Sequence, residues 1–239
     1  MSTAATVILI IVIAVALVAV WLIVQTGSHA ELASPSATST TAGAPNPGTA
    51  SSSAPAGFSQ SISDGTITIS YPSSDFGLAT NPTQILVHSY IPPCDQGFDY
   101  CLYYLGSAFQ GTNFESAGIR IQKRTDLTDE NSCLTTPPQG YTTAPSSTTS
   151  SGAAYAASRF SVGGAAAGHF SLGTLYRIFY RPANACYEFE TRVGETQFAN
   201  YPSGTIRQFT SNDLGAIQSE LGQLLGTLKL ANGESVNLP

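Results

Sequence analysis

The chain has 239 residues, a formal net charge of −6 and only 10% charged residues. This acidic balance argues against a nucleic-acid partner, which normally needs a basic patch. The length alone permits one or two domains. The composition changes sharply after residue 57, which favours a single globular domain. Residues 58–239 are numerous enough to bury one sizeable core.

The N-terminus predicts a single membrane-spanning signal-anchor helix over residues 1–25, because the run from Val7 to Val24 is entirely apolar. About 20 helical residues at about 1.5 Å each span a hydrocarbon core of roughly 30 Å. Trp21 stands near the outer end, where an indole favours the headgroup level. A cleaved secretory signal is the alternative, with Ser28-His29-Ala30 as its cleavage site, but no Lys or Arg precedes the run.

Residues 26–57 consist mainly of Ser, Thr, Ala, Pro and Gly. Such a segment buries too little apolar surface to offset the entropy lost on ordering. We therefore expect a disordered tether between the anchor and an extracytoplasmic domain at 58–239.

Strand patterns dominate the domain. Alternating or β-branched runs predict strands at 65–71, 84–91, 101–105, 117–124, 156–162, 172–181 and 185–193. In the fourth strand, Ile119 and Ile121 fall on one face, and Arg120 and Gln122 fall on the other. Pro182-Ala183-Asn184 predicts a compact hairpin connection. The Pro, Ser, Thr and Gly content of 135–152 and 163–168 indicates two long loops.

The pattern becomes helical near the C-terminus. Ser211-Asn212-Asp213 offers an N-cap, and a helix is expected over 213–226, followed by a short strand at 228–230. The apolar residues at helical spacing are Leu214, Ile217, Leu221, Leu224 and Leu225. The predicted fold class is α+β, with a mainly antiparallel β-sheet domain and a C-terminal amphipathic helix packed on the sheet.

Four cysteines allow three disulfide pairings, of which we favour Cys94–Cys101 and Cys133–Cys186. The first pairing closes a short loop after a Pro-Pro stop, and the second ties a loop to the last hairpin. Oxidised cysteines place the domain outside the cytoplasm. The Cys-x6-Cys spacing is not that of a zinc site, and the three histidines are scattered, so neither a metal nor another cofactor is expected.

No nucleophile elbow, metalloprotease helix or phosphate-binding loop occurs, so no catalytic residue is assigned. His169, after the Gly-rich 163–168 segment, is the best candidate for a general base. A cell-envelope hydrolase with a site assembled from loops near His169 is therefore one alternative. The acidic group Asp126, Asp129 and Glu130 is interpreted as a solvated loop with a helix-capping aspartate.

Aromatic and acidic residues are concentrated at 95–105. Aromatic rings beside carboxylates suit recognition of a sugar or peptide. The predicted binding residues are Asp95, Asp99, Tyr100, Tyr103 and Tyr104. Strand alternation puts Tyr100 and Tyr104 on one face and Tyr103 on the other, and one of these faces must pack on the core.

The order of elements resembles the PsbP-like α/β sandwich, the fold of the photosystem II extrinsic subunit and of various envelope lipoproteins. The resemblance is carried by the opening Asp64-Gly65 turn with Tyr71-Pro72, the hairpin formed by 175–180 and 186–190, and the closing helix and apolar strand. It implies a non-catalytic binding or assembly protein, and it carries over no functional residue.

We therefore expect a single-pass membrane protein of the cell envelope whose extracytoplasmic module binds a protein or glycan. A pilin-like structural subunit is a further alternative. Against it, the chain shows no basic leader, no processing glycine and no early glutamate, and its apolar helix runs into a tether. The sequence does not fix an oligomeric state.

Overall fold

The computed structural model describes residues 57–79, 98–151 and 154–238. By its contacts the chain divides into residues 1–51 and 52–239, and every described residue belongs to the second unit. The predicted anchor, nearly all of the predicted tether and the strand predicted at 84–91 lie outside the described residues. Within the described ranges, no helix is both long and apolar enough to cross a membrane.

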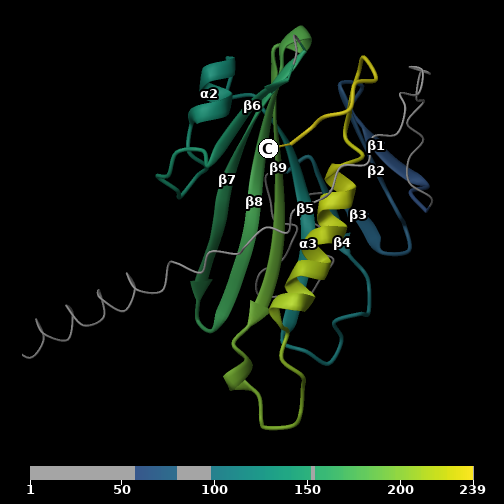
Figure 1. Ribbon diagram of the computed structural model, residues 1–239, viewed down its shortest axis with the longest axis vertical. Helices are drawn as coiled ribbons and strands as arrows, with labels where there is room; N and C mark the ends of the chain where they lie inside the picture. The colour runs from purple at the N-terminus through teal and green to yellow at the C-terminus, as the bar shows by residue number, and fades with distance from the viewer. Residues whose placement is uncertain (1–56, 80–97, 152–153, 239) are drawn as a thin grey trace, which may run out of the picture. The chain divides into compact units, whose positions relative to one another are not determined.

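A seven-stranded antiparallel sheet forms the main layer (Figure 1), which confirms the prediction of a mainly antiparallel β domain. Its strands follow the order β3-β4-β5-β9-β8-β7-β6, so the long strands β5, β9 and β8 lie at its centre. Their bounds, in that order, are Phe76–Ala79, Tyr100–Tyr104, Phe114–Arg124, Ala185–Thr196, His169–Tyr180, Tyr155–Ala166 and Ser147–Ser151.

A second sheet and two α-helices complete the described part. The three-stranded sheet has the order β1-β2-β10, with bounds Gln60–Ser63, Ile67–Tyr71 and Lys229–Leu230. The helices are α2 (Glu130–Thr135) and α3 (Ser211–Leu225), and single 3-10 turns cover Arg181–Ala183 and Phe198–Asn200. Helix α3 contacts β2, β5 and β9, whereas α2 contacts β7 and β8.

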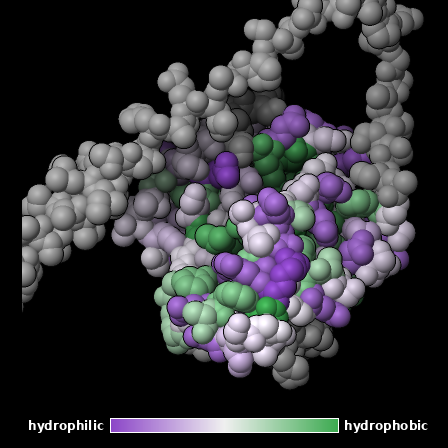
Figure 2. Space-filling view, turned by 60° about the horizontal axis from the view of Figure 1, so that its bottom comes forward, coloured by the Kyte–Doolittle hydropathy of each residue, from purple (hydrophilic) through white to green (hydrophobic). Residues whose placement is uncertain are grey.

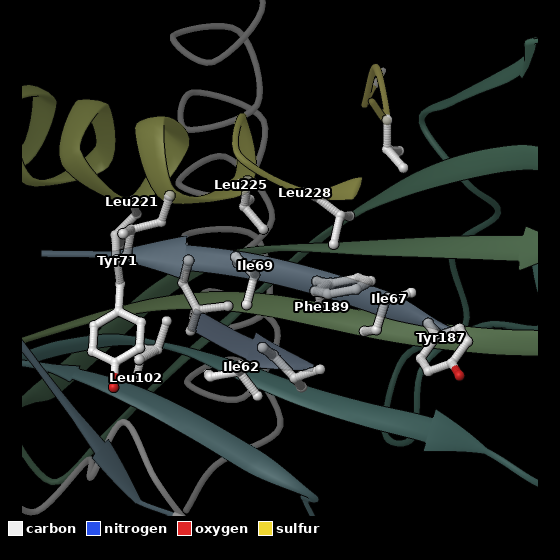
Figure 3. Packing of buried hydrophobic residues seen from close by; sticks show 14 of the residues in the cluster. Ile62, Ile67, Ile69, Tyr71, Leu102, Tyr187, Phe189, Leu221, Leu225 and Leu228 are labelled. Carbon is white, nitrogen blue, oxygen red and sulfur yellow. The ribbon is translucent and has the colours of Figure 1, made fainter. Parts of the chain in front are cut away.

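The main core lies between α3, the small sheet and one face of the large sheet. Helix α3 buries Ile217, Leu221, Leu224 and Leu225, all of which the helical spacing selects. Figure 3 shows Leu221 and Leu225 pointing from the helix towards the strands. The helix begins with a capping box between Thr210 and Asp213, which satisfies backbone N–H groups that would otherwise lack partners.

The prediction of two long loops at 135–152 and 163–168 is partly wrong. Residues 147–151 form edge strand β6, and the β7–β8 hairpin continues to the Ala166–His169 pair. These segments hold Ser, Thr, Ala and Gly, which carry no apolar alternation, so only pairing with the neighbouring strand makes them extended. The turn of the hairpin is formed by Ala167 and Gly168, which have φ of 52° and 81°. Strands β1 and β3 were not predicted either, and helix α2 was foreseen only through its capping aspartate.

The predicted Cys133–Cys186 disulfide is present and joins α2 to β9. Both of its cysteines are buried, together with Leu127 and Phe179, on the sheet face opposite α3. Cys101 is also disulfide-bonded, and Cys94, its predicted partner, lies outside the described residues.

Candidate functional site

The sheet face opposite α3 carries charged side chains across its central strands. Strand pairing places Arg120 opposite Glu190, and Gln122 opposite Glu188. The next strand adds Arg177, which pairs with Glu188. We call this set the charged face; it comprises Arg120, Gln122, Arg124, Arg177, Glu188, Glu190 and Arg192.

Ion pairs connect almost all of the charged face. Glu188 Oε2 accepts from Arg124 Nη1 at 2.7 Å and from Arg177 Nε at 2.8 Å. Glu190 pairs with Arg120 and, at 3.3 Å, with Arg192. Each carboxylate therefore lies between two guanidinium groups, which compensates the cost of burying these charges.

The residues at the centre of this network are buried. Arg177 is fully inaccessible, and Glu188 and Glu190 are only 5% and 7% exposed. Burial lowers the pKa of Arg177, whereas its bond to Glu188 acts in the opposite direction. Since an arginine ordinarily titrates above about 12, this side chain remains charged at neutral pH.

Asp126 extends the network towards solvent. Its carboxylate accepts two hydrogen bonds from Arg124, at 2.8 and 2.7 Å. The hydrogen bond from Arg124 lowers the pKa of Asp126 to about 2, so this carboxylate is ionised under ordinary conditions. The pair fixes the orientation of Arg124 at the edge of the charged face.

A cavity of about 580 Å³ opens onto the charged face, within the range of about 300–1,000 Å³ typical of small-molecule sites. Charged, amide and apolar groups all contribute to its lining. The lining residues are Phe98, Arg120, Gln122, Arg124, Asp126, Pro138, Gln139, Tyr141, Val162, Leu175, Glu188, Glu190 and Arg192. Those from the sheet are held by strand pairing, so this part of the site is rigid.

The segment after α2 supplies a wall of the cavity through Pro138, Gln139 and Tyr141. Arg177 Nη1 donates to the carbonyl of Thr136 at the start of this segment. At its far end, the Tyr141 hydroxyl donates to Gly163 O at 2.9 Å and accepts from Gly163 N at 2.7 Å. The wall is thus attached to the sheet at both ends.

Helix α2, which precedes the wall, is also attached to the rest of the domain. Glu130 receives two hydrogen bonds from Arg181, at 2.7 and 2.8 Å. Asp129 caps the helix, as the sequence predicted for an aspartate of this acidic group. Together with the Cys133–Cys186 disulfide, these contacts make α2 a fixed support for the wall.

The predicted binding residues do not gather at this cavity. Tyr100 and Tyr104 are half-buried against the main core, whereas Tyr103 packs beside Ala79 and Cys101 on the other face. Asp99 accepts a hydrogen bond from the backbone N–H of Lys123 at 2.7 Å. Asp95 lies outside the described residues.

Tyr104 belongs to an aromatic cluster, with ring centroids 5.7 Å from Phe76 and 6.1 Å from Phe114. It also lines a second cavity of about 540 Å³, which Asp75 and Glu220 line too. Burial, followed by the charges of Glu220 and Asp75, raises the pKa of Tyr104. Burial likewise raises the pKa of Glu220.

His169 has an acidic neighbour, because its Nδ1 lies 3.1 Å from Oε2 of Glu115. Neither cavity has His169 among its lining residues. Among the residues that the structure describes, no group of three or more His, Cys, Asp or Glu side chains is arranged to hold a metal ion.

The end of the domain near the β7–β8 turn exposes several large apolar side chains, including Phe170, Leu172 and Phe198. Figure 2, which brings the lower end of Figure 1 forward, shows the visible hydrophobic residues in separate groups with hydrophilic ones between them. The described surface in this view therefore offers no continuous apolar patch for docking.

Sequence reasoning missed the charged face, although two signals pointed to it. Arg120 and Gln122 alternate with isoleucines. Glu188, Glu190 and Arg192 alternate along a strand whose other side chains suit a core. Charges in two central strands indicate a polar face. The charged residues of the two strands meet because β5 pairs with β9, and neither segment encodes this pairing alone.

Comparison of the chain with protein-family models, curated proteins and solved structures finds no match. The resemblance to the PsbP-like family therefore stays a prediction from the order of elements. The function has to be argued from the site itself.

Proposed function

We propose that the described domain is a non-catalytic binding module of a membrane-anchored, extracytoplasmic protein, and that its ligand occupies the cavity on the charged face. The observation that carries this proposal is the buried Arg–Glu network beneath an open cavity. Well-packed apolar residues often stabilise a protein as much as buried ion pairs do, so stability alone gives little reason for such a face. Fixed, convergent polar groups are what a recognition site requires.

The cysteines and the sequence of the N-terminus support the proposed compartment. The Cys133–Cys186 disulfide suits an oxidising environment outside the cytoplasm. The apolar run before the tether would hold the module at the membrane surface. In this arrangement the cavity samples ligands within reach of the tether at the cell envelope.

Site-specific photo-crosslinking in cells that naturally produce the protein tests the proposal. Gln139 is exposed on the cavity wall, and Gln218 is exposed on α3, away from both cavities. A benzophenone side chain at 139 should give a discrete adduct that is absent when the group is at 218. The adduct should also be lost when Arg192→Ala is combined with the probe at 139.

Equal labelling from both positions, or no adduct from position 139, would contradict the proposal. Circular dichroism and thermal unfolding of each substituted protein establish that the loss of an adduct does not reflect unfolding. Both probe positions are exposed, so both variants should fold.

The hydrolase alternative is favoured by one observation, the contact of His169 with Glu115. An acid that orients a histidine is a common arrangement for general-base catalysis. If this alternative holds, His169→Asn should abolish release of soluble fragments from isolated cell walls by the full chain, and the Gln139→Ala variant should retain it.

A further inference from the structure

We infer that the ligand of the charged-face cavity is a neutral carbohydrate. This inference rests on the proposed function and specifies the chemical class of the ligand for that site. It follows from the near balance of charge at the site, from the polar groups that are left to bind a ligand, and from the presence of apolar groups beside the polar ones in the lining.

The charges of the described lining residues balance one another. Among the residues that the structure describes, three guanidinium groups and three carboxylates line the cavity, contributed by Arg120, Arg124, Arg192, Asp126, Glu188 and Glu190. Arg177, which is buried beneath the lining and pairs with Glu188, adds a fourth guanidinium group, so the charged face and Asp126 together carry an excess of one positive charge. This small excess gives only a weak net attraction for an anion, in contrast to anion sites, where basic residues predominate.

The same charges are also paired with each other. Arg124 contacts both Asp126 and Glu188, and Glu190 contacts both Arg120 and Arg192. An incoming carboxylate or phosphate would compete with these acids for the arginines, and an incoming ammonium would compete with the arginines for the acids. A hydroxyl group can instead bind beside an existing pair, because it both donates and accepts.

The groups that remain to bind a ligand are mostly uncharged. Within the described part of the chain, the side-chain amides of Gln122 and Gln139 make no hydrogen bond, and both line the cavity. Each amide offers two donors and one acceptor atom. Glu188 accepts both of its hydrogen bonds at Oε2, which leaves Oε1 to accept another. Mixed donors and acceptors match the hydroxyl groups of a sugar.

The lining also contains apolar groups. Tyr141 is half-buried and packs against Val162 and Leu175, and Pro138 adjoins them in the wall. Phe98 stands at the cavity with its ring 4.0 Å from the guanidinium carbon of Arg120. A pyranose ring has an apolar C–H face and a rim of hydroxyl groups, so it can contact an aromatic or aliphatic side and a hydrogen-bonding side at once.

A zwitterion such as a short peptide is the strongest rival, because it carries both charges. To use both of its charges it would have to open one of these arginine–carboxylate pairs, whereas a neutral sugar leaves every pair intact. The unpaired amides favour the neutral ligand over the zwitterion.

The test uses the full chain in detergent micelles on an array of immobilised glycans that includes neutral, sialylated and amino-sugar members. Titration calorimetry then follows with the best neutral glycan, with its uronic acid counterpart and with the dipeptide Ala-Ala. We expect binding of neutral glycans, weakened about tenfold or more in Gln122→Ala and in Phe98→Ala. The matched variant Gln218→Ala on α3 should bind like the unaltered chain.

Each outcome bears on one of the two proposals. Binding of the acidic glycan or of Ala-Ala in preference to neutral glycans would overturn the inference, as would the absence of any glycan binding. If a discrete adduct still forms from position 139 in either case, the module has a ligand of another class, and only the carbohydrate inference fails. If neither glycans nor adducts are found, the proposed function fails as well.

Discussion

The hydroxyl of Tyr187 donates a hydrogen bond of 2.6 Å to Oδ2 of Asp64, and this contact joins the seven-stranded sheet to the turn before β2. The other oxygen of Asp64 accepts from the backbone N–H groups of Thr66 and Ile67, at 2.8 and 3.0 Å. Burial acts to raise the pKa of Asp64, but the hydrogen bonds from Tyr187 and the backbone outweigh it and lower the pKa below its usual value. Burial and the same hydrogen bond raise the pKa of Tyr187.

Removal of this hydroxyl should weaken the attachment of the small sheet. Tyr187→Phe is expected to lower the free energy of unfolding by about 1 kcal/mol, because a hydrogen bond to a charged but accessible group is lost. Urea unfolding measures the change. Tyr100→Phe is the matched control, since within the described residues its hydroxyl makes no hydrogen bond. An equal loss in both variants would show that the Asp64 contact contributes nothing specific.

The contribution of Asp64 to stability depends on pH in a definite direction. Because folding lowers the pKa of Asp64, its contribution to stability is present above the unfolded value near 3.8 and is lost as the pH falls through the lower folded value. Urea unfolding of the unaltered chain should therefore show a loss of stability between about pH 5 and about pH 2. This loss should be smaller in Tyr187→Phe; an unchanged acid dependence would contradict the assignment.

Arg177 should be required for the fold of the charged face. Arg177→Met leaves Glu188 buried with one cation fewer and removes the donor to Thr136 O, so a loss of about 3–5 kcal/mol is expected. Combining it with Glu188→Gln removes the unpaired charge. Chemical denaturation should show that the double variant loses less than the sum of the two single variants. Additive losses would indicate that the two residues are not coupled.

We predict that Tyr103 has a packing role, because its ring lies against Gly77. The two residues pair across β3 and β4, and a Cβ atom added to Gly77 would lie 2.3 Å from the Tyr103 ring. Gly77→Ala should displace the ring and cost about 1–3 kcal/mol, as other overpacked substitutions do. Thermal unfolding should show that the same change costs much less when Tyr103→Ala is already present. If Gly77→Ala costs the same stability with and without Tyr103→Ala, the Tyr103 ring does not have this packing role.

The Cys133–Cys186 disulfide closes a separation of 53 residues, for which chain entropy predicts a contribution of about 4 kcal/mol. The double substitution of both cysteines by alanine should lower the denaturation midpoint accordingly. It should also increase hydrogen exchange in α2 and in the wall at 136–141, because the disulfide attaches that helix to β9. Exchange that rises only in β9 would show that the other contacts of the helix, such as those of Arg181 with Glu130, hold it without the disulfide.

Local patterns in the sequence determined the elements with strong periodicity. The alternation at 117–124 predicted β5, and the leucine spacing at 213–226 predicted α3, because these patterns state which side chains face the core. The turn at Pro182-Ala183-Asn184 was also readable, since Asn184 tolerates its left-handed conformation with φ of 47°. Segments of Ser, Gly and Ala, such as β6, carry no such pattern and were interpreted as loops.

The candidate site was decided by tertiary structure. Arg120 and Glu190 are 70 residues apart, and only the pairing of β5 with β9 makes them partners over one cavity. The sequence drew attention to the aromatic residues at 100–104, yet alternation sends them to opposite faces, where they pack on Phe76 or Gly77. Periodicity specifies which way a side chain points along its own strand. The register between strands specifies which charges meet, and that register depends on the packing of the whole sheet.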